Sequence, residues 1–258
     1  MTVVVKVGGA LIDSEPARHT LMRYLKPLLA LEPVVLVHGG GAQATELARR
    51  MGHTPRMING RRVTTDLDLD IHLWVTLGEL NARMLGAAFA AGIQAMGLNG
   101  ASAGLLEVTR RPPRMINDEE VDFGWVGDVS RVNGAICQTL LNAGVLPVIA
   151  PLGVDRRGLL YNVNADSVAA QIALALGASR LLFVAEAGAL RRRADVNAER
   201  IHQVDRALFE QGRAAGFIVD GMLAKLENAF TARADGVAEV YICAPADLSD
   251  PTRGTQVL

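Results

Sequence analysis

Residues 3–9 read Val-Val-Val-Lys-Val-Gly-Gly, and residues 34–41 read Val-Val-Leu-Val-His-Gly-Gly-Gly. Runs of β-branched residues that end in glycine are typical of strands buried on both faces of a parallel sheet. Glycines between a strand and the next helix present backbone N–H groups beside the helix N-terminus, where an anion is favoured. Lys6 adds a full positive charge at the same place. The two stretches therefore predict a site for a strongly anionic ligand that carries phosphate and carboxylate groups.

The composition predicts a globular protein whose ligand is small. The chain has 258 residues, of which 50% are apolar, and a formal net charge of −1. This length suffices for a large core in one domain or two lobes. The balanced charge predicts no nucleic-acid partner and no docking to an anionic membrane. The basic run Arg191-Arg192-Arg193 is interpreted as a solvated loop. No apolar run approaches the ~18 residues that a membrane-spanning helix needs.

Cysteine and histidine usage indicates the compartment and the metal content. Cys137 and Cys243 are the only cysteines, and both lie among apolar neighbours. We therefore expect buried, reduced thiols in a cytoplasmic protein, and no secretion signal precedes the first strand. No histidine pairs with a cysteine or another histidine at ligand spacing, so we expect no metal held by the protein itself. The histidines are His19, His38, His53, His72 and His202.

Strand-like and helix-like segments alternate along the chain. Beyond the two strands quoted above, buried strands are predicted at residues 95–98, 146–150, 181–184 and 240–243. Helices are predicted at residues 14–31, 44–51 and 65–91, and from about residues 133, 166, 205 and 221. This alternation predicts an α/β fold, with a mostly parallel sheet covered by helices on both faces. Residues 105–132 are predicted to form short hairpins.

One long helix and one seam organise the predicted domain. Thr65 is expected to cap a helix that continues to about residue 91 and is apolar on more than one side. Such a helix is either central or at an interface. Residues 151–158 are rich in turn formers but too short for a flexible linker. We therefore expect a single domain over residues 1–258, with an N-lobe at about 1–152 and a C-lobe at about 153–258.

Three polar residues occupy alternate positions in the second half. Residues 161–166 read Tyr-Asn-Val-Asn-Ala-Asp and lead into an alanine-rich helix. Helix capping by Asn164 or Asp166 accounts for one of these side chains but not for all three. Asn162 and Asn164 can donate amide N–H groups to a carboxylate, and Asp166 can orient an ammonium group. The spacing thus favours a binding site over a simple cap.

Two basic residues add to this set. Lys225 lies one turn into a predicted helix, after an Asp-Gly-Met turn and between apolar neighbours. Arg62 lies in the short basic turn Gly60-Arg61-Arg62, from which an arginine can fork onto a carboxylate. A solvated surface position is the alternative for each of them.

A serine hydrolase is an alternative from a different class. Residues 100–104 match the pattern G-x-S-x-G, and His-Gly-Gly-Gly at 38–41 resembles an esterase oxyanion loop. That pattern requires a strand that runs directly into a helix, whereas Ser102 is followed by a strand-like stretch and only His202 comes later. The Asp-Phe-Gly triplet at 122–124 lacks the other protein-kinase motifs, and no Walker P-loop is present. We therefore favour none of these classes.

Taken together and in this order, the motifs resemble the amino-acid kinase family. The matching segments are VVKVGGALI (4–12), VVLVHGGG (34–41), NGRRVT (59–64), WVGDV (125–129), NAGVLPVIAPLG (142–153), NVNAD (162–166), GFIVDGMLAKLENA (216–229) and GTQVL (254–258). NGRRVT and NVNAD are most similar to the acetylglutamate branch of the family. The resemblance implies a three-layer α/β/α sandwich with an eight-stranded, mainly parallel sheet, commonly assembled as a homodimer through its long helix.

The resemblance also implies a reaction: ATP-dependent phosphorylation of the side-chain carboxylate of N-acetyl-L-glutamate in arginine biosynthesis. Mg²⁺ would be bound through the phosphates, the acyl amino acid in the N-lobe and the nucleotide in the C-lobe. Catalytic roles fall on Lys6, Lys225 and Asp166, acyl-amino-acid binding on Gly40, Gly41, Arg62, Asn162 and Asn164, and phosphate or nucleotide contacts on Gly8, Gly9, Gly39, Gly188, Phe217, Ile218 and Val219. A kinase of a related acylated amino acid, of the aminoadipate type, and a non-catalytic amino-acid-binding regulator are the alternatives.

One segment departs from the family pattern. After the strand at 181–184 the family usually has a turn D-V-x-G-[IV] that contacts the nucleotide, and here residues 185–189 read Ala-Glu-Ala-Gly-Ala. The aspartate is replaced by Ala185, while Gly188 is kept. We therefore expect weaker nucleotide binding.

Overall fold

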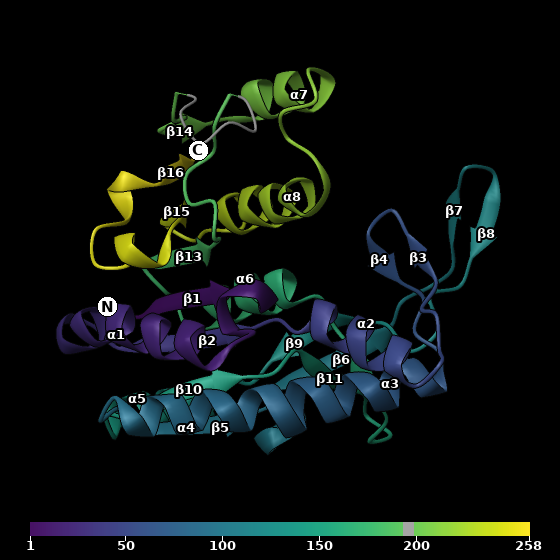
Figure 1. Ribbon diagram of the computed structural model, residues 1–258, viewed down its shortest axis with the longest axis horizontal. Coiled ribbons are helices and arrows are strands. Elements are labelled where there is room, and N and C mark those ends of the chain that lie inside the picture. Colours follow the sequence, from purple (N-terminus) through teal and green to yellow (C-terminus); the bar gives the residue numbers. More distant parts are fainter. Residues whose placement is uncertain (193–198) are drawn as a thin grey trace.

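The computed structural model describes residues 1–192 and 199–258, arranged around one eight-stranded sheet (Figure 1). Across the sheet the strands follow the order β14 (Gln203–Val204), β16 (Thr255–Val257), β15 (Glu239–Cys243), β13 (Arg180–Val184), β1 (Val3–Val7), β2 (Val34–His38), β10 (Leu146–Ile149) and β5 (Ala95–Leu98). Neighbouring strands are parallel except for the antiparallel pair β15 and β16. The predicted, mainly parallel sheet is thus confirmed.

Helices cover both faces of this sheet, which confirms the three-layer α/β/α arrangement (Figure 1). One face carries α1 (Glu15–Leu31), α2 (Gly41–Arg50) and a long helix made of α3 (Asp66–His72), the π-helical segment η2 (Leu73–Asn81) and α4 (Ala82–Ala90). The other face carries α5 (Ala135–Asn142), α6 (Ala165–Ala175), α7 (Arg206–Ala214) and α8 (Asp220–Ala234). Each face has its own core of buried apolar side chains.

The first strand shows how the sheet directs side chains to these two cores. Val3, Val5 and Val7 enter the core under α1 and the long helix, and Val4 enters the core under α6 and α8. Side chains alternate between the two faces of a strand, so Lys6 shares the face of Val4. The lysine therefore points toward α6 and α8.

The long helix begins as predicted. Thr65 caps α3 in a capping box: its Oγ1 atom accepts a hydrogen bond from the Asp68 backbone N–H at 3.2 Å, and Asp68 Oδ2 accepts one from the Thr65 backbone N–H at 3.1 Å. Farther along the helix, Asn81 is buried and donates from Nδ2 to the Val148 carbonyl at 3.0 Å. The same amide lies 3.1 Å from Nε2 of His38, which is also buried. These polar contacts join the helix to β2 and β10.

Between β5 and α5 the chain forms the predicted hairpins, because β6 (Leu106–Arg110) pairs antiparallel with β9 (Gly127–Val132). These two strands belong to a second sheet, which β11 (Leu152–Val154) and β12 (Leu160–Asn162), from beyond β10, complete in the order β12, β11, β6, β9. Two small hairpins, β3 (Met57–Ile58) with β4 (Arg61–Arg62) and β7 (Arg114–Ile116) with β8 (Glu119–Val121), extend from one end of the molecule (Figure 1). Short 3₁₀ turns lie at Gly9–Ile12, Ser102–Gly104, Pro245–Asp247 and Pro251–Arg253.

The structure gives no support to the serine-hydrolase alternative. Ser102 begins a three-residue 3₁₀ turn that is followed by strand β6, so no strand runs directly into a helix at this serine. Its Oγ atom accepts a hydrogen bond from the Asn99 backbone N–H at 3.0 Å. Ser102 thus closes a turn and lacks the geometry of a nucleophile elbow.

Both cysteines are free and buried, and burial raises the pKa of the Cys137 thiol to about 11 and that of Cys243 to about 12. Over residues 1–192 and 199–258, no helix has the length and apolarity needed to cross a bilayer. In the basic run, Arg191 is half-buried and Arg192 exposed, while Arg193 lies outside the described residues.

Candidate active site

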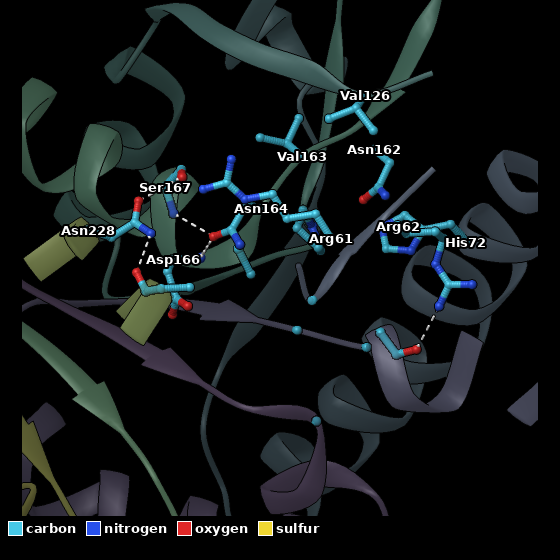
Figure 2. A pocket seen from close by; sticks show the side chains of 18 of the residues that line it. Arg61, Arg62, His72, Val126, Asn162, Val163, Asn164, Asp166, Ser167 and Asn228 are labelled. Atoms are coloured by element: carbon cyan, nitrogen blue, oxygen red, sulfur yellow. Dashed lines mark hydrogen bonds between the residues drawn. The ribbon is translucent and has the colours of Figure 1, made fainter. Parts of the chain in front are cut away.

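A cavity of about 640 Å³ opens where β1 and β2 end and where α2 and α6 begin (Figure 2). Nine of the residues singled out from the sequence line it: Lys6, Gly9, Gly39, Gly40, Gly41, Arg62, Asn162, Asn164 and Asp166. Six others do not: Gly8, Gly188, Phe217, Ile218, Val219 and Lys225. Long-range packing therefore unites the motifs of the first half with the NVNAD segment of the second.

Asp166 lies between two lysines. Its Oδ1 atom is 2.8 Å from Nζ of Lys6 and 3.4 Å from Nζ of Lys225, and all three residues are less than a tenth exposed. Burial alone raises the pKa of the Asp166 carboxyl, but the two ammonium groups outweigh burial, and the net pKa is lowered. The Asp166 carboxylate is thus ionised at neutral pH and pairs with both lysines at one end of the cavity.

Lys225, in α8, contacts Asp166 but does not itself line the cavity. Burial lowers the pKa of its ammonium group to about 8, an effect that Asp166 opposes and Lys6 adds to. Its Nζ atom also lies 5.3 Å from the centre of the Phe183 ring. The chain has only three lysines and 23 arginines. Two of the three lysines therefore share one aspartate, while Lys26 donates to the Ala91 carbonyl at the surface.

The glycine turns bring backbone close to the cavity. Gly40 caps α2, and a Cβ atom at this position would lie 2.7 Å from Thr76 Cγ2 and 2.8 Å from Leu80 Cδ1. A Cβ atom at Gly9 would lie 2.7 Å from Gln43 Oε1. Glycine at position 40 thus lets α2 pack closely against Thr76 and Leu80 of the long helix, whereas at position 9 the clash would be with the movable end of the Gln43 side chain. The first N–H groups of α2 then face the cavity from a helix N-terminus, where negative charge is stabilised.

Arg62 is held in place before any ligand binds. Its guanidinium donates to Thr45 Oγ1 at 2.6 Å and to the Gly41 carbonyl at 3.1 Å, and lies 3.5 Å from Asp68 Oδ1. Its side chain is 8% exposed. Asp68 thus serves both the cap of α3 and the orientation of Arg62, a double role that the sequence motif did not reveal.

The two asparagines have different local roles. Asn164 is the N-cap of α6, because its Oδ1 atom accepts hydrogen bonds from the backbone N–H groups of Asp166 at 2.8 Å and Ser167 at 3.1 Å. This confirms capping as one function of the segment. Asn162 donates from Nδ2 to Thr64 Oγ1 at 3.1 Å. Both residues also line the cavity, so neither is only a cap or only a surface residue.

Several residues that line the cavity received no role from the sequence, among them Arg61, Arg111 and His72. Arg111 pairs with Asp128, with Nη2 2.6 Å from Asp128 Oδ1. Burial lowers the pKa of Arg61, and the charge of Arg111 adds to this effect. In Figure 2, Arg62 and His72 lie on one side of the cavity, Asn164 and Asp166 lie on the other, and Arg61 lies between. Arg61 is visible in the NGRRVT motif, whereas no local signal distinguishes His72.

The residues expected to contact the nucleotide lie outside this cavity. Gly188 has φ +66° in the turn after β13, and a Cβ atom there would lie 3.1 Å from Ala244 Cβ. Ile218 is buried against Gly212 of α7, and Val219 is half exposed at the N-cap of α8. These residues lie in the turn after β13 and at the start of α8, and none of them lines the cavity.

A family model described as the amino acid kinase family matches residues 1–244. The chain is 39% identical over 254 residues to the acetylglutamate kinase of Anaeromyxobacter sp. (strain K), with 96% of this chain and 93% of that protein covered. It is 37% identical over 258 residues to the acetylglutamate kinase of Bacteroides thetaiotaomicron, with 98% and 97% covered.

Solved structures share the fold. An N-acetylglutamate synthase from Neisseria gonorrhoeae, complexed with coenzyme A and N-acetyl-glutamate, has a TM-score of 0.82 at 22% identity; the match covers 99% of this chain and 59% of that longer chain. Carbamate kinase from Giardia lamblia bound to AMP-PNP has a TM-score of 0.68 at 13% identity, with 100% and 98% covered.

Proposed function

Because this chain belongs to the amino acid kinase family, we propose that it transfers the γ-phosphate of ATP to the side-chain carboxylate of N-acetyl-L-glutamate, as a step of arginine biosynthesis. The product is an acyl phosphate. The observation that carries this proposal is the buried Lys6–Asp166–Lys225 cluster at the end of a cavity lined by three arginines. Such a site suits two anionic substrates that must approach each other.

The proposed reaction requires positive charge in the site and does not require a general base. A carboxylate is already ionised at pH 7, so no group has to remove a proton from the nucleophile. The barrier comes from bringing two anions together and from the charge that spreads over the transferred phosphoryl oxygens. In the proposal Lys6 and Lys225 stabilise this charge, and Asp166 holds both ammonium groups without accepting a proton. Each well-placed donor in such a site is worth roughly 3–4 kcal/mol.

The remaining lining residues position the acceptor. Arg62 would hold the α-carboxylate, with the amide groups of Asn162 and Asn164 as further donors, and the backbone N–H groups of Gly40 and Gly41 would face the reacting carboxylate. The fixed guanidinium of Arg62 supports this role because its orientation is set by Thr45 and Asp68 before binding. Preorganised donors lose little entropy on binding.

The phosphate and nucleotide contacts are assigned to the opposite side. Gly8, Gly9 and Gly39 would receive the γ-phosphate, and the segments around Gly188 and residues 217–219 the nucleoside. The N-lobe, about 1–152, would then bind the acceptor and the C-lobe, about 153–258, the nucleotide. Lys6 belongs to the first lobe and Asp166 to the second, so their ion pair lies where the two substrates would meet.

ATP would bring Mg²⁺ on its phosphates. Within the described part of the chain, no three histidine, cysteine or acidic side chains are grouped to hold a metal, and the Asp166 carboxylate is occupied by lysines. The site therefore fits a Mg²⁺ ion that is held by the phosphate oxygens of ATP, where the ion would neutralise part of the phosphate charge.

Trapping the product tests the function. With ATP and N-acetyl-L-glutamate, hydroxylamine should give a hydroxamate, and the Lys6→Ala variant should give almost none while Lys26→Ala matches the wild type. Free glutamate, N-acetylaminoadipate and other acylated amino acids serve as competing acceptors. An equal signal with any of these refutes the substrate assignment, and binding without product supports a regulator.

A second copy of the chain is the proposed partner. The long helix exposes 51% of Trp74 and 85% of Phe89, and Met96 is 46% exposed nearby in β5. A homodimer would bury such large apolar side chains. Trp74→Glu and Phe89→Glu should convert a dimer into monomers in analytical ultracentrifugation, whereas Leu31→Glu on α1, which is 73% exposed, should not. A monomeric wild type refutes the dimer. The expected cytoplasmic location stays a prediction.

A further inference from the structure

His72 is a buried polar residue to which the proposed function assigns no role. It ends α3, is 5% exposed and lines the cavity. Neither of its ring nitrogens makes a hydrogen bond with the described residues, although the Pro151 backbone lies close enough to the ring to influence its pKa. A buried imidazole normally finds partners for both nitrogens, since an unpaired polar atom is costly. The ring is therefore a candidate for a contact that forms only when the cavity is filled.

The ring is neutral at physiological pH. Burial, together with the nearby charge of Arg62, lowers the pKa of His72 to about 4, although the Pro151 backbone opposes the change. A neutral imidazole has one N–H donor and one nitrogen with a free lone pair. The Pro151 carbonyl is an acceptor, so it favours the tautomer whose N–H points toward it. The other nitrogen is then left as a hydrogen-bond acceptor.

The position of Arg62 indicates which part of the substrate reaches this nitrogen. Arg62 and His72 lie on the same side of the cavity, opposite Asn164 and Asp166 (Figure 2). In the proposed function Arg62 holds the α-carboxylate of the acceptor. The acyl amide is attached to the same carbon atom as that carboxylate. An acceptor bound in this way therefore presents its amide beside His72.

We propose that His72 is a positioning and specificity-determining residue whose free ring nitrogen accepts a hydrogen bond from the amide N–H of the acylated amino acid. The inference rests on the proposed function and adds a reason for acyl selectivity. A free amino acid would place an ammonium group next to the Arg62 guanidinium, and a neutral imidazole cannot offset that repulsion. An acylated nitrogen carries no charge and still donates one hydrogen bond.

Replacing the amide N–H of the substrate by an oxygen tests the contact directly. The probe is 2-acetoxyglutarate, the ester analogue of N-acetylglutamate, which keeps both carboxylates. Wild-type kcat/KM should be about 2- to 12-fold higher for the amide than for the ester, which is the range for one hydrogen bond. In His72→Leu this ratio should approach one, and the KM for N-acetylglutamate should rise with kcat changed less. His72→Gln, whose amide oxygen can accept a hydrogen bond, should recover part of the ratio.

Controls separate this contact from a structural role. His19→Gln changes a surface histidine of α1 and should keep the wild-type ratio and melting temperature. A lower melting temperature in His72→Leu with an unchanged amide-to-ester ratio overturns the proposal, because His72 would then only pack or hold a water molecule. Equal use of amide and ester by the wild type also overturns it, even if His72→Leu fails to fold. If the wild type phosphorylates none of the acceptors, the proposed function itself is refuted.

Discussion

The ammonium nitrogen of Lys6 lies 2.8 Å from Oδ1 of Asp166, and this ion pair joins the first strand to a helix of the second half. Both side chains are 10% exposed. Removing one partner of a buried pair leaves the other charge uncompensated, which typically costs about 3–5 kcal/mol. Variants at this cluster should therefore be compared for stability as well as for activity.

Lys6→Ala and Lys225→Ala should each lower kcat by about two orders of magnitude or more, since each removes a donor to charge that develops during transfer. The KM for the amino acid should change less, because this charge is small in the ground state. A coupled ADP-release assay measures both constants. Lys26→Ala, at the only other lysine, is the matched control. Near-normal kcat in either site variant would remove that lysine from the mechanism.

Activity should fall on the alkaline side as Lys225 loses its proton. Burial lowers the pKa of this ammonium group to about 8, so kcat/KM, which reports the free enzyme, should decline above about pH 8. Bound phosphates stabilise the protonated form, so the decline of kcat should begin at higher pH. Because the chain has three lysines, ¹⁵N-lysine NMR can follow the titration with few signals. A flat profile to pH 10 would contradict this prediction.

Arg62→Ala should raise the KM for the acyl amino acid by roughly 10- to 100-fold, the range for charged hydrogen bonds, with a smaller change in kcat. The affinity for ATP should stay normal. Arg56→Ala, an exposed arginine before the same hairpin, is the control and should behave like the wild type. If ATP affinity fell while acceptor affinity held, Arg62 would belong to the nucleotide site and the lobe assignment would be wrong.

Ala185→Asp should lower the KM for ATP by about 2- to 12-fold if the turn contacts the nucleotide, because it restores one hydrogen-bond acceptor. Ala185 is half-buried, and its N–H donates to the Cys243 carbonyl at 3.0 Å. Glu186 is exposed and could substitute for the missing carboxylate. Glu186→Ala should then raise the KM. If neither change alters the KM for ATP, this turn does not contact the nucleotide.

Acid should destabilise the fold through its buried histidines. Burial lowers the pKa of His38 from 6.5 to about 4, whereas the unfolded chain takes up that proton near pH 6.5. The unfolded state thus binds more protons between these values, and the free energy of unfolding should fall by roughly 3 kcal/mol for this histidine as the pH drops from 6.5 to 4. Urea unfolding at pH 7.5 and 4.5 measures the difference. His38→Gln should reduce it and His19→Gln should not; equal differences would contradict the assignment.

Local interactions made much of the fold and several site residues predictable. Valine runs that end in glycine predicted β1 and β2, and Thr65 caps α3 as predicted. Asn164, one of the two candidates that the sequence offered, caps α6. Such features depend on residues within one turn or one strand. The resemblance of the ordered motifs to a family then named Lys6, Asp166 and Lys225 together, although nothing in their spacing along the chain brings them into contact.

Only the tertiary structure decided which of these residues meet, and with what partners. The parallel sheet places Lys6 opposite α6 and α8. As a result, Oδ1 of Asp166 contacts the ammonium groups of both Lys6 and Lys225. Packing of α3 against the cavity left both ring nitrogens of His72 without partners, which no local pattern signals. The physical reason is that burial, desolvation and ion pairing depend on segments far apart in sequence, whereas strand periodicity and helix capping depend on near neighbours.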